Sequence, residues 1–146
     1  MRKHFISICM ILGIIIVQSC KKENSHETNA FQEKLLQSSN WYLKDFKTSP
    51  KLEDETMLVN YDEFSINKEV SGRFRVVFFF NGQLIQTLSE ATFKNGSSNN
   101  FMLDGEFDQM YFSDNNLQCK NRSEWKGKVY ELEYVFSSTK SKGKSD

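Results

Sequence analysis

Hydrophobic and polar side chains alternate along the chain from Asn40 onward, and aromatic or β-branched residues are frequent at the apolar positions. A period of two is typical of β-strands, whose successive side chains point to opposite faces of a sheet. The segment Lys128–Ser137 has the clearest pattern, with apolar side chains on one face and Glu131 and Glu133 on the other. The apolar residues are Tyr130, Leu132, Tyr134 and Phe136. This segment is therefore predicted to be a strand with one dry and one solvated face.

A β-hairpin is predicted where Asn81-Gly82 separates the apolar segments Arg73–Phe80 and Gln83–Leu88. Asn-Gly is the strongest short-range hairpin signal, because both residues of the tight turn must adopt positive φ angles. Alternate residues of the first segment share one face, which we expect to be buried. These residues are Phe74, Val76, Phe78 and Phe80.

Shorter segments of the same kind predict the rest of the fold. They are Trp41–Phe46, a stretch near Met57–Ile66, Ala91–Phe93, Phe101–Leu103, Glu106–Phe112 and Leu117–Asn121. Turn signals lie at Asn95-Gly96, Asp104-Gly105 and Ser113–Asn116. Eight or nine short strands, spaced by about ten residues, indicate an all-β, antiparallel barrel or sandwich.

Three segments fall outside the strand pattern. Asn29 followed by Gln32 is typical of a helix N-terminus, so residues 30–38 are predicted to form a short amphipathic helix that covers the domain. The segment Lys47–Glu55 contains Pro50 and is predicted to be a charged insertion. Residues 139–146 lack apolar side chains and are predicted to be a disordered tail.

The N-terminus has the pattern of a signal peptide, predicted to cover residues 1–19. Arg2 and Lys3 precede the apolar run Phe5–Val17, which is shorter than the roughly 20 residues of a membrane-spanning helix. The run ends in Val17-Gln18-Ser19-Cys20, which resembles the lipobox of bacterial lipoproteins. This resemblance implies cleavage before Cys20 and attachment of lipid to its thiol. The alternatives are an ordinary secretory signal with a coincidental cysteine, or an uncleaved anchor helix.

Lipidation at Cys20 would make the residues after it a tether. Residues 20–29 contain nothing that could join a hydrophobic core, so we expect them to be flexible and the folded domain to span 30–138. Two or three acyl chains would hold the protein stably on a membrane. The resemblance implies a place in the cell envelope, and we expect the outer membrane of a Gram-negative bacterium, with the leaflet left open.

The body of the chain resembles the small lipocalin-like lipoproteins of bacterial envelopes between about Asn40 and Ser138. The segments that carry the resemblance are Trp41-Tyr42-Leu43, Phe64-Ser65-Ile66-Asn67, Leu117-Gln118-Cys119 and Tyr134-Val135-Phe136. It implies an eight-stranded up-and-down barrel, whose interior either holds one small apolar molecule or is filled by its own side chains. The candidate residues for lining a ligand site or the core are Trp41, Phe74, Phe78, Tyr130 and Tyr134.

Charge and histidine content exclude several functions. The chain has 146 residues with 19 basic and 19 acidic side chains, which suits one domain and leaves no basic surface for nucleic acid. His4 and His26 lie in the predicted signal peptide and tether. The predicted domain therefore lacks the histidine that Ser-His-Asp and Cys-His catalysis require and that most catalytic zinc sites use. We expect a protein that is not an enzyme and that holds no metal or cofactor.

The remaining reactive side chains have structural interpretations as well as chemical ones. Cys119 is interpreted as a small buried apolar residue, and a reactive or intermolecular thiol is the alternative. Asp104, Glu106 and Asp108 alternate along one predicted strand face and could form a carboxylate pair or a calcium site, although a solvated face explains them more simply. Glu53-Asp54-Glu55 is interpreted as a solvated loop.

Arg73 and Arg75 are predicted to lie on the polar face of the hairpin, opposite Phe74. Two guanidinium groups on one face could bind a carboxylate or phosphate of a ligand. More commonly such a pair is balanced by acids on a neighbouring strand, for which Glu131 and Glu133 are the candidates.

Two functions remain open. The first is a lipid-anchored binding module that carries a small hydrophobic ligand or an envelope component. The second is a protein-interaction lipoprotein, such as an accessory part of an envelope machine, an inhibitor or an immunity protein, with a solid core. For the second function, Lys47–Glu55 and an exposed Trp125 in the turn before Lys128 are the candidate contacts. A cavity of several hundred Å³ favours the first function, and a packed interior with an apolar outer patch favours the second.

Overall fold

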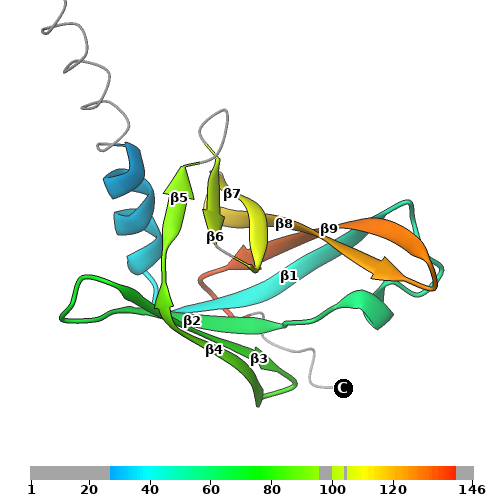
Figure 1. The fold of residues 1–146 in the computed structure, drawn as a ribbon, viewed down its shortest axis with the longest axis horizontal. Coiled ribbons are helices and arrows are strands. Elements are labelled where there is room, and N and C mark those ends of the chain that lie inside the picture. The colour runs from blue at the N-terminus through cyan, green and yellow to red at the C-terminus, as the bar shows by residue number, and fades with distance from the viewer. Residues whose placement is uncertain (1–26, 96–99, 104, 141–146) are drawn as a thin grey trace, which may run out of the picture.

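The structure, a computed structural model, describes residues 27–95, 100–103 and 105–140. These residues form one α-helical segment, residues 27–36, a short 3₁₀ helix and nine β-strands (Figure 1). The 3₁₀ helix, η1, is Glu55–Leu58. The strands are β1 Asn40–Ser49, β2 Glu63–Lys68, β3 Phe74–Phe80, β4 Gln83–Ala91, β5 Phe93–Asn95, β6 Phe101–Leu103, β7 Phe107–Ser113, β8 Asn116–Trp125 and β9 Lys128–Ser137.

The strands form one antiparallel sheet in the order β4-β3-β2-β1-β9-β8-β7-β6-β5. Every neighbouring pair except β1 and β9 consists of strands that follow each other in the sequence, so the fold is a meander. The sheet curls into a nearly closed barrel, which confirms the predicted all-β antiparallel barrel. It has nine strands rather than eight because the chain bends at Thr92, so that β4 pairs with β3 whereas β5 pairs with β6.

The Asn81-Gly82 hairpin forms as predicted between β3 and β4. Both residues adopt positive φ angles, 51° and 74°, and Phe80 pairs with Gln83 directly beside the turn. Three of the four residues expected on the inner face of β3 are buried, and Phe80 at the end of the strand is half-buried. The turn chemistry and the alternation together fix the register of this hairpin.

Aromatic side chains fill the interior of the barrel. Phe64 and Phe136 meet edge to face with their ring centroids 5.0 Å apart, and Phe78 and Phe107 do so at 6.1 Å. The largest fully buried side chains are Tyr134, Phe64, Phe78, Phe107, Phe136, Leu35, Ile66, Leu103, Met110, Leu117, Leu132 and Val76. The barrel is therefore packed around its own side chains.

The N-terminal helix closes one end of the barrel (Figure 1). Leu35 is fully buried, and Phe31 stacks on Phe101 with the ring centroids 4.0 Å apart. The predicted helix start is wrong, because residues 27–29, assigned above to the tether, are already helical. The spacing of Phe31 and Leu35 places both on one helix face, and docking of this face on the barrel outweighs the capping preference of Asn29.

The segment Lys47–Glu55 is not a simple insertion, because β1 continues to Ser49. Thr48 is buried, and both its backbone N–H and its hydroxyl donate to Glu55 Oε1, at 2.9 and 3.0 Å. Asp54 then caps η1 by accepting from the backbone N–H of Thr56. As a result Glu55 is not a solvated loop residue, and the predicted strand near Met57 starts only at β2.

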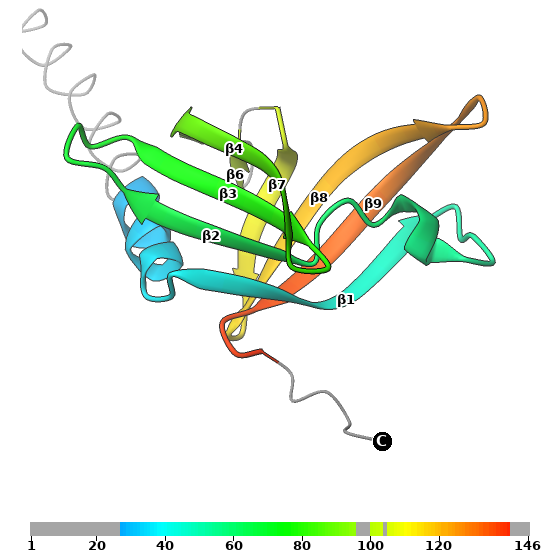
Figure 2. The ribbon, with the colours of Figure 1, turned by 90° about the horizontal axis from the view of Figure 1, so that it is seen from below.

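Beyond the barrel, β1, β8 and β9 continue as a three-stranded arm on the side away from the helix (Figure 2). The β8–β9 hairpin that ends the arm turns at Lys126 and Gly127, which have φ angles of 50° and 73°. Strand β8 is longer than predicted, because its pairing with β9 continues to Trp125 opposite Lys128.

Candidate functional site

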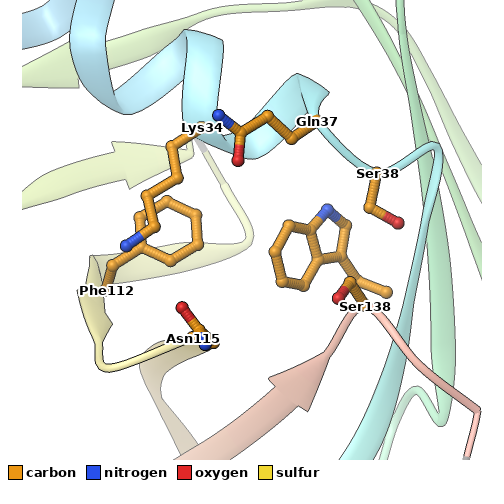
Figure 3. A pocket seen from close by; sticks show the side chains of 7 residues that line it. Lys34, Gln37, Ser38, Phe112, Asn115 and Ser138 are labelled. Carbon is orange, nitrogen blue, oxygen red and sulfur yellow. The ribbon is translucent and has the colours of Figure 1, made fainter.

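A groove of about 310 Å³ lies beside the helix at one end of the barrel (Figure 3). Segments that are distant in sequence meet there, namely the end of the helix, the start of β1, the β7–β8 connection and the residue after β9. The lining residues are Lys34, Gln37, Ser38, Trp41, Phe112, Asn115 and Ser138. They combine an aromatic base with amide, hydroxyl and ammonium groups.

Lys34 is the charged residue of this groove. Its ammonium group lies 4.5 Å from the centroid of the Phe112 ring and donates to the backbone carbonyl oxygen of Asp114 at 3.2 Å. Trp41 lies beside Phe112 at a centroid distance of 5.7 Å. Its indole Nε1–H donates to the carbonyl of Leu35 at 3.1 Å, which ties the end of the helix to β1. The groove therefore holds a cation fixed next to aromatic rings.

A polar cluster lies at the other end of the barrel, centred on Glu106. The Tyr61 hydroxyl donates to Glu106 Oε2 at 2.5 Å, and Gln86 Nε2 donates to Glu106 Oε1 at 2.6 Å. Asn121 Nδ2 donates to the backbone carbonyl of Glu106 at 2.9 Å. Gln86 belongs to β4 and Glu106 directly precedes β7. The cluster therefore connects two parts of the barrel that no strand pairing joins among the described residues.

Two phenols of this region have raised pKa values. Burial, together with the neighbouring Glu106 carboxylate, raises the pKa of Tyr61 well above its usual range. Burial raises the pKa of Tyr134 to about 12, an increase that neighbouring Asn60 partly offsets. The phenol oxygen of Tyr134 and Oδ1 of Asn121 are buried without a hydrogen-bond partner among the described residues. Both phenols are therefore neutral at physiological pH.

The cluster does not contain the pair of carboxylates that the sequence left possible at Asp104, Glu106 and Asp108. Asp108 is exposed on β7, where it and Gln109 both lie between the buried residues Phe107 and Met110. Glu106 instead lies in the turn before β7, where it is half-buried and accepts hydrogen bonds from Tyr61 and Gln86, so it neither pairs with Asp108 nor belongs to a solvated strand face. Asp104 lies outside the described residues. Within residues 27–95, 100–103 and 105–140, no group of three His, Cys, Asp or Glu side chains could hold a metal ion.

The outer side of β3 and β4 carries an apolar patch, which we call the apolar wall. It consists of the half-buried Val77 and Phe79 and of Leu84 and Ile85, which are 63% and 51% exposed. Phe79 pairs with Leu84 in the sheet, so the two side chains are cross-strand neighbours. An outward-facing cluster of large apolar residues is a common mark of an interaction surface.

The outer side of β8 and β9 is charged instead. Lys120 Nζ lies 3.3 Å from Glu133 Oε2 and 3.7 Å from Glu131 Oε1. The prediction that these glutamates balance Arg73 and Arg75 is wrong, because β9 does not neighbour β3 in the sheet. Arg73 instead forms an ion pair with Glu90 of β4.

The structure places the five predicted lining residues in the core. Trp41, Phe74, Phe78, Tyr130 and Tyr134 are all buried, and of these Trp41 also borders the groove.

The two predicted cysteine sites and the turn tryptophan have different outcomes. Cys119 is fully buried, and burial raises the pKa of its thiol, so it is shielded from reagents. Trp125 is half-buried rather than exposed, since it packs against Tyr130 with Lys126 Nζ 4.2 Å from its ring centroid. Cys20 lies outside the described residues.

The sequence pattern did not point to Lys34, Tyr61 or Gln86 as site residues. One signal was available for the polar cluster: Asn121 follows Leu117 and Cys119 at a spacing of two, which places a polar side chain on the inner face of β8. A polar residue at such a position predicts a hydrogen-bonded partner inside the barrel.

Neither the protein-family models nor the curated proteins with which the chain was compared match it. In the part of the chain that the structure describes, no helix has the length and hydrophobicity needed to cross a bilayer.

Proposed function

We propose that this chain is a non-catalytic lipoprotein, anchored to a cell-envelope membrane through Cys20, that binds an envelope protein through its apolar wall. The observation that carries the proposal is the contrast between a packed interior and an apolar outer patch. Ligand sites inside proteins usually occupy about 300–1,000 Å³, whereas aromatic rings fill the space within this barrel. A ligand carried inside it is therefore the less favoured function.

The apolar wall is better suited to bind a protein than the other surfaces described above. Leu84 and Ile85 lie next to each other at the start of β4, and β4 is an edge of the sheet, with no strand of the described residues paired on its outer side. The wall therefore combines exposed apolar area with hydrogen-bonding groups that an extended segment of a partner could pair with. By contrast, the charged groups on β8 and β9 already pair with one another across the strands.

The anchor is tested by Cys20→Ser, followed by fractionation of the producing cells. We expect the wild-type protein to pellet with membranes and the variant to appear in the soluble fraction. A variant that still pellets with membranes although its mass shows that residues 1–19 have been removed would contradict lipidation at Cys20, without bearing on the apolar wall.

The interaction surface is tested with a photoreactive amino acid placed at Leu84 or Ile85 in the producing cell. We expect both positions to crosslink to the same envelope protein, and Leu84→Asp to abolish the crosslink formed from position 85. Position 70 is the matched control, because Val70 is a fully exposed apolar residue outside the wall. Equal crosslinking from position 70, or none from either wall position, would overturn the proposed surface.

A further inference from the structure

We propose that the groove beside the helix binds a small amphiphile with an anionic head, either a carboxylate or a phosphate, attached to an apolar body. This site lies on the helix side of the barrel and is independent of the apolar wall. Its volume of about 310 Å³ is at the lower end of the range of about 300–1,000 Å³ that is usual for ligand sites. The ligand is therefore small.

The charge of the groove indicates that its ligand is an anion. Among its lining residues Lys34 is a cation, and none of the others is an acid. No described carboxylate lies within ion-pair distance of the Lys34 ammonium, which has one hydrogen bond, to the Asp114 carbonyl. An ammonium has three donors, so two of them remain for a ligand. The half-buried Lys34 is thus a fixed positive charge without a counter-charge.

The neighbouring side chains complete a head-group site. Gln37 and Asn115 offer amide groups on opposite sides of the groove, and Ser138 adds a hydroxyl (Figure 3). Ser38 also lines the groove, but its hydroxyl donates to the carbonyl of Asn40 at 2.7 Å, so it can act toward a ligand only as an acceptor. Amide N–H groups and an ammonium are the donors that carboxylate and phosphate oxygens accept from.

The aromatic residues at the base of the groove indicate that the ligand has an apolar body. Phe112 is half-buried and Trp41 lies beside it, with the two rings inclined at 54°. The indole N–H of Trp41 is already bonded to Leu35, so toward the groove Trp41 can offer only ring carbon. An aromatic or short aliphatic group would lie against Phe112, next to the edge of the buried Trp41 ring, while its anionic head reaches Lys34.

The test uses Trp41 as a reporter in the secreted Cys20→Ser chain, in which Trp125→Phe removes the second tryptophan. Phenylacetate and phenyl phosphate are titrated and the fluorescence of Trp41 is measured. We expect saturable binding of at least one of them, weakened about tenfold by Lys34→Met and retained in Lys34→Arg. Phenylacetamide, which has the same ring without the charge, is expected to bind about tenfold more weakly.

Lys128→Met is the matched control, because Lys128 also lies over an aromatic ring, 5.7 Å from the centroid of Tyr130, but on the arm. It should leave binding unchanged. No binding of either anion, equal binding by Lys34→Met, or equal binding of phenylacetamide would overturn the proposal.

A second experiment distinguishes a membrane lipid from a free small molecule as the source of the anion. The same chain is sedimented with vesicles of phosphatidylglycerol and, separately, of phosphatidylcholine. Binding to the anionic vesicles that Lys34→Met abolishes would assign the groove to a lipid head group. If the chain binds phenylacetate or phenyl phosphate but neither kind of vesicle, the ligand is a soluble one.

Discussion

The two ends of the barrel are closed by opposite kinds of chemistry. At the helix end, Phe31 stacks on Phe101 and lies within ring-contact distance of Phe93 and Phe112. At the other end, Glu106 accepts hydrogen bonds from Tyr61 and Gln86. The first end is held by buried apolar area, and the second by directed polar contacts.

The difference shows what each kind of closure can achieve. Burial of apolar area is non-directional, so the helix end gains stability without fixing precisely how the strands meet. Hydrogen bonds require defined distances and angles, so the bridge between Gln86 and Glu106 aligns β4 with the start of β7 where no strand pairing does so in the described residues. The apolar end should therefore contribute more stability, and the polar end more sensitivity to pH.

The largest effect is expected from Phe31→Ala. It removes a ring that is 6% exposed and stacked on Phe101, so the free energy of unfolding should fall by about 3–5 kcal/mol. Urea unfolding followed by circular dichroism measures the change, and Val70→Ala, at a fully exposed position, should have almost no effect. A loss below about 1 kcal/mol would mean that the helix contributes little to closure.

At the polar end, Glu106→Ala should cost about 1.5–3 kcal/mol, because it leaves the Tyr61 hydroxyl and the Gln86 amide without their acceptor. Glu106→Gln keeps an acceptor oxygen and should cost less than half as much. Asp108→Ala, on the exposed side of β7, serves as the control in the same urea titrations. If Glu106→Ala and Asp108→Ala gave equal values, the cluster would have no part in stability.

A smaller effect concerns alkaline pH. Tyr134 has its pKa raised from 10.0 to about 12 in the folded protein, so the unfolded chain loses this proton first as the pH rises. Its contribution to stability is complete below pH 10 and is lost between about pH 10 and 12, with about 1–1.5 kcal/mol gone at pH 11. Urea titrations at pH 9 and 11 should show this loss in the wild type and less of it in Tyr134→Phe.

The same variant provides an internal control at neutral pH. The Tyr134 hydroxyl is buried near Asn60 but makes no hydrogen bond within the part of the chain that the structure describes, so Tyr134→Phe should leave stability at pH 7 unchanged or slightly increased. A clear loss at pH 7 would show that the hydroxyl is bonded, for example to Asn60.

The smallest of the expected effects is that of a single hydrogen bond at the helix end, which the indole N–H of Trp41 donates to the carbonyl of Leu35. Loss of this bond in Trp41→Phe should cost about 1 kcal/mol, in addition to the cost of the smaller buried ring. Hydrogen exchange of the amides in residues 31–36 should become faster than in Trp125→Phe. Equal exchange in the two variants would mean that apolar contact alone holds the helix in place.

Local chemistry made the strands predictable. The Asn81-Gly82 turn needs positive φ angles at both residues, and the alternation on either side leaves one register that buries Phe74 and Phe78. The same reasoning identified the last strand, because Tyr134 and Phe136 share its buried face. These elements depend on contacts within about fifteen residues, which a sequence pattern contains.

The candidate sites were not predictable in this way. Tyr61, Gln86 and Glu106 come from three separate parts of the chain, and none of them lies in a motif with a defined spacing. Lys34 belongs to a helix whose start was misplaced, and its partner Phe112 lies far along the chain. Such contacts form only when the sheet has curled into the barrel. Predicting them therefore requires the order of the strands in the sheet, which the pattern within single strands does not contain.

The pairing of β1 with β9 also determines the order of events during synthesis. Tyr42 and Ser137 are neighbours in the sheet although they lie at opposite ends of the described strands, whereas every other pair of strands is joined through a nearby turn or loop. Until β9 has left the ribosome, β1 can pair on one side only, and contacts this distant in sequence form slowly. The barrel can therefore close only after β9 has been made, and until then β1 to β4 can pair only among themselves.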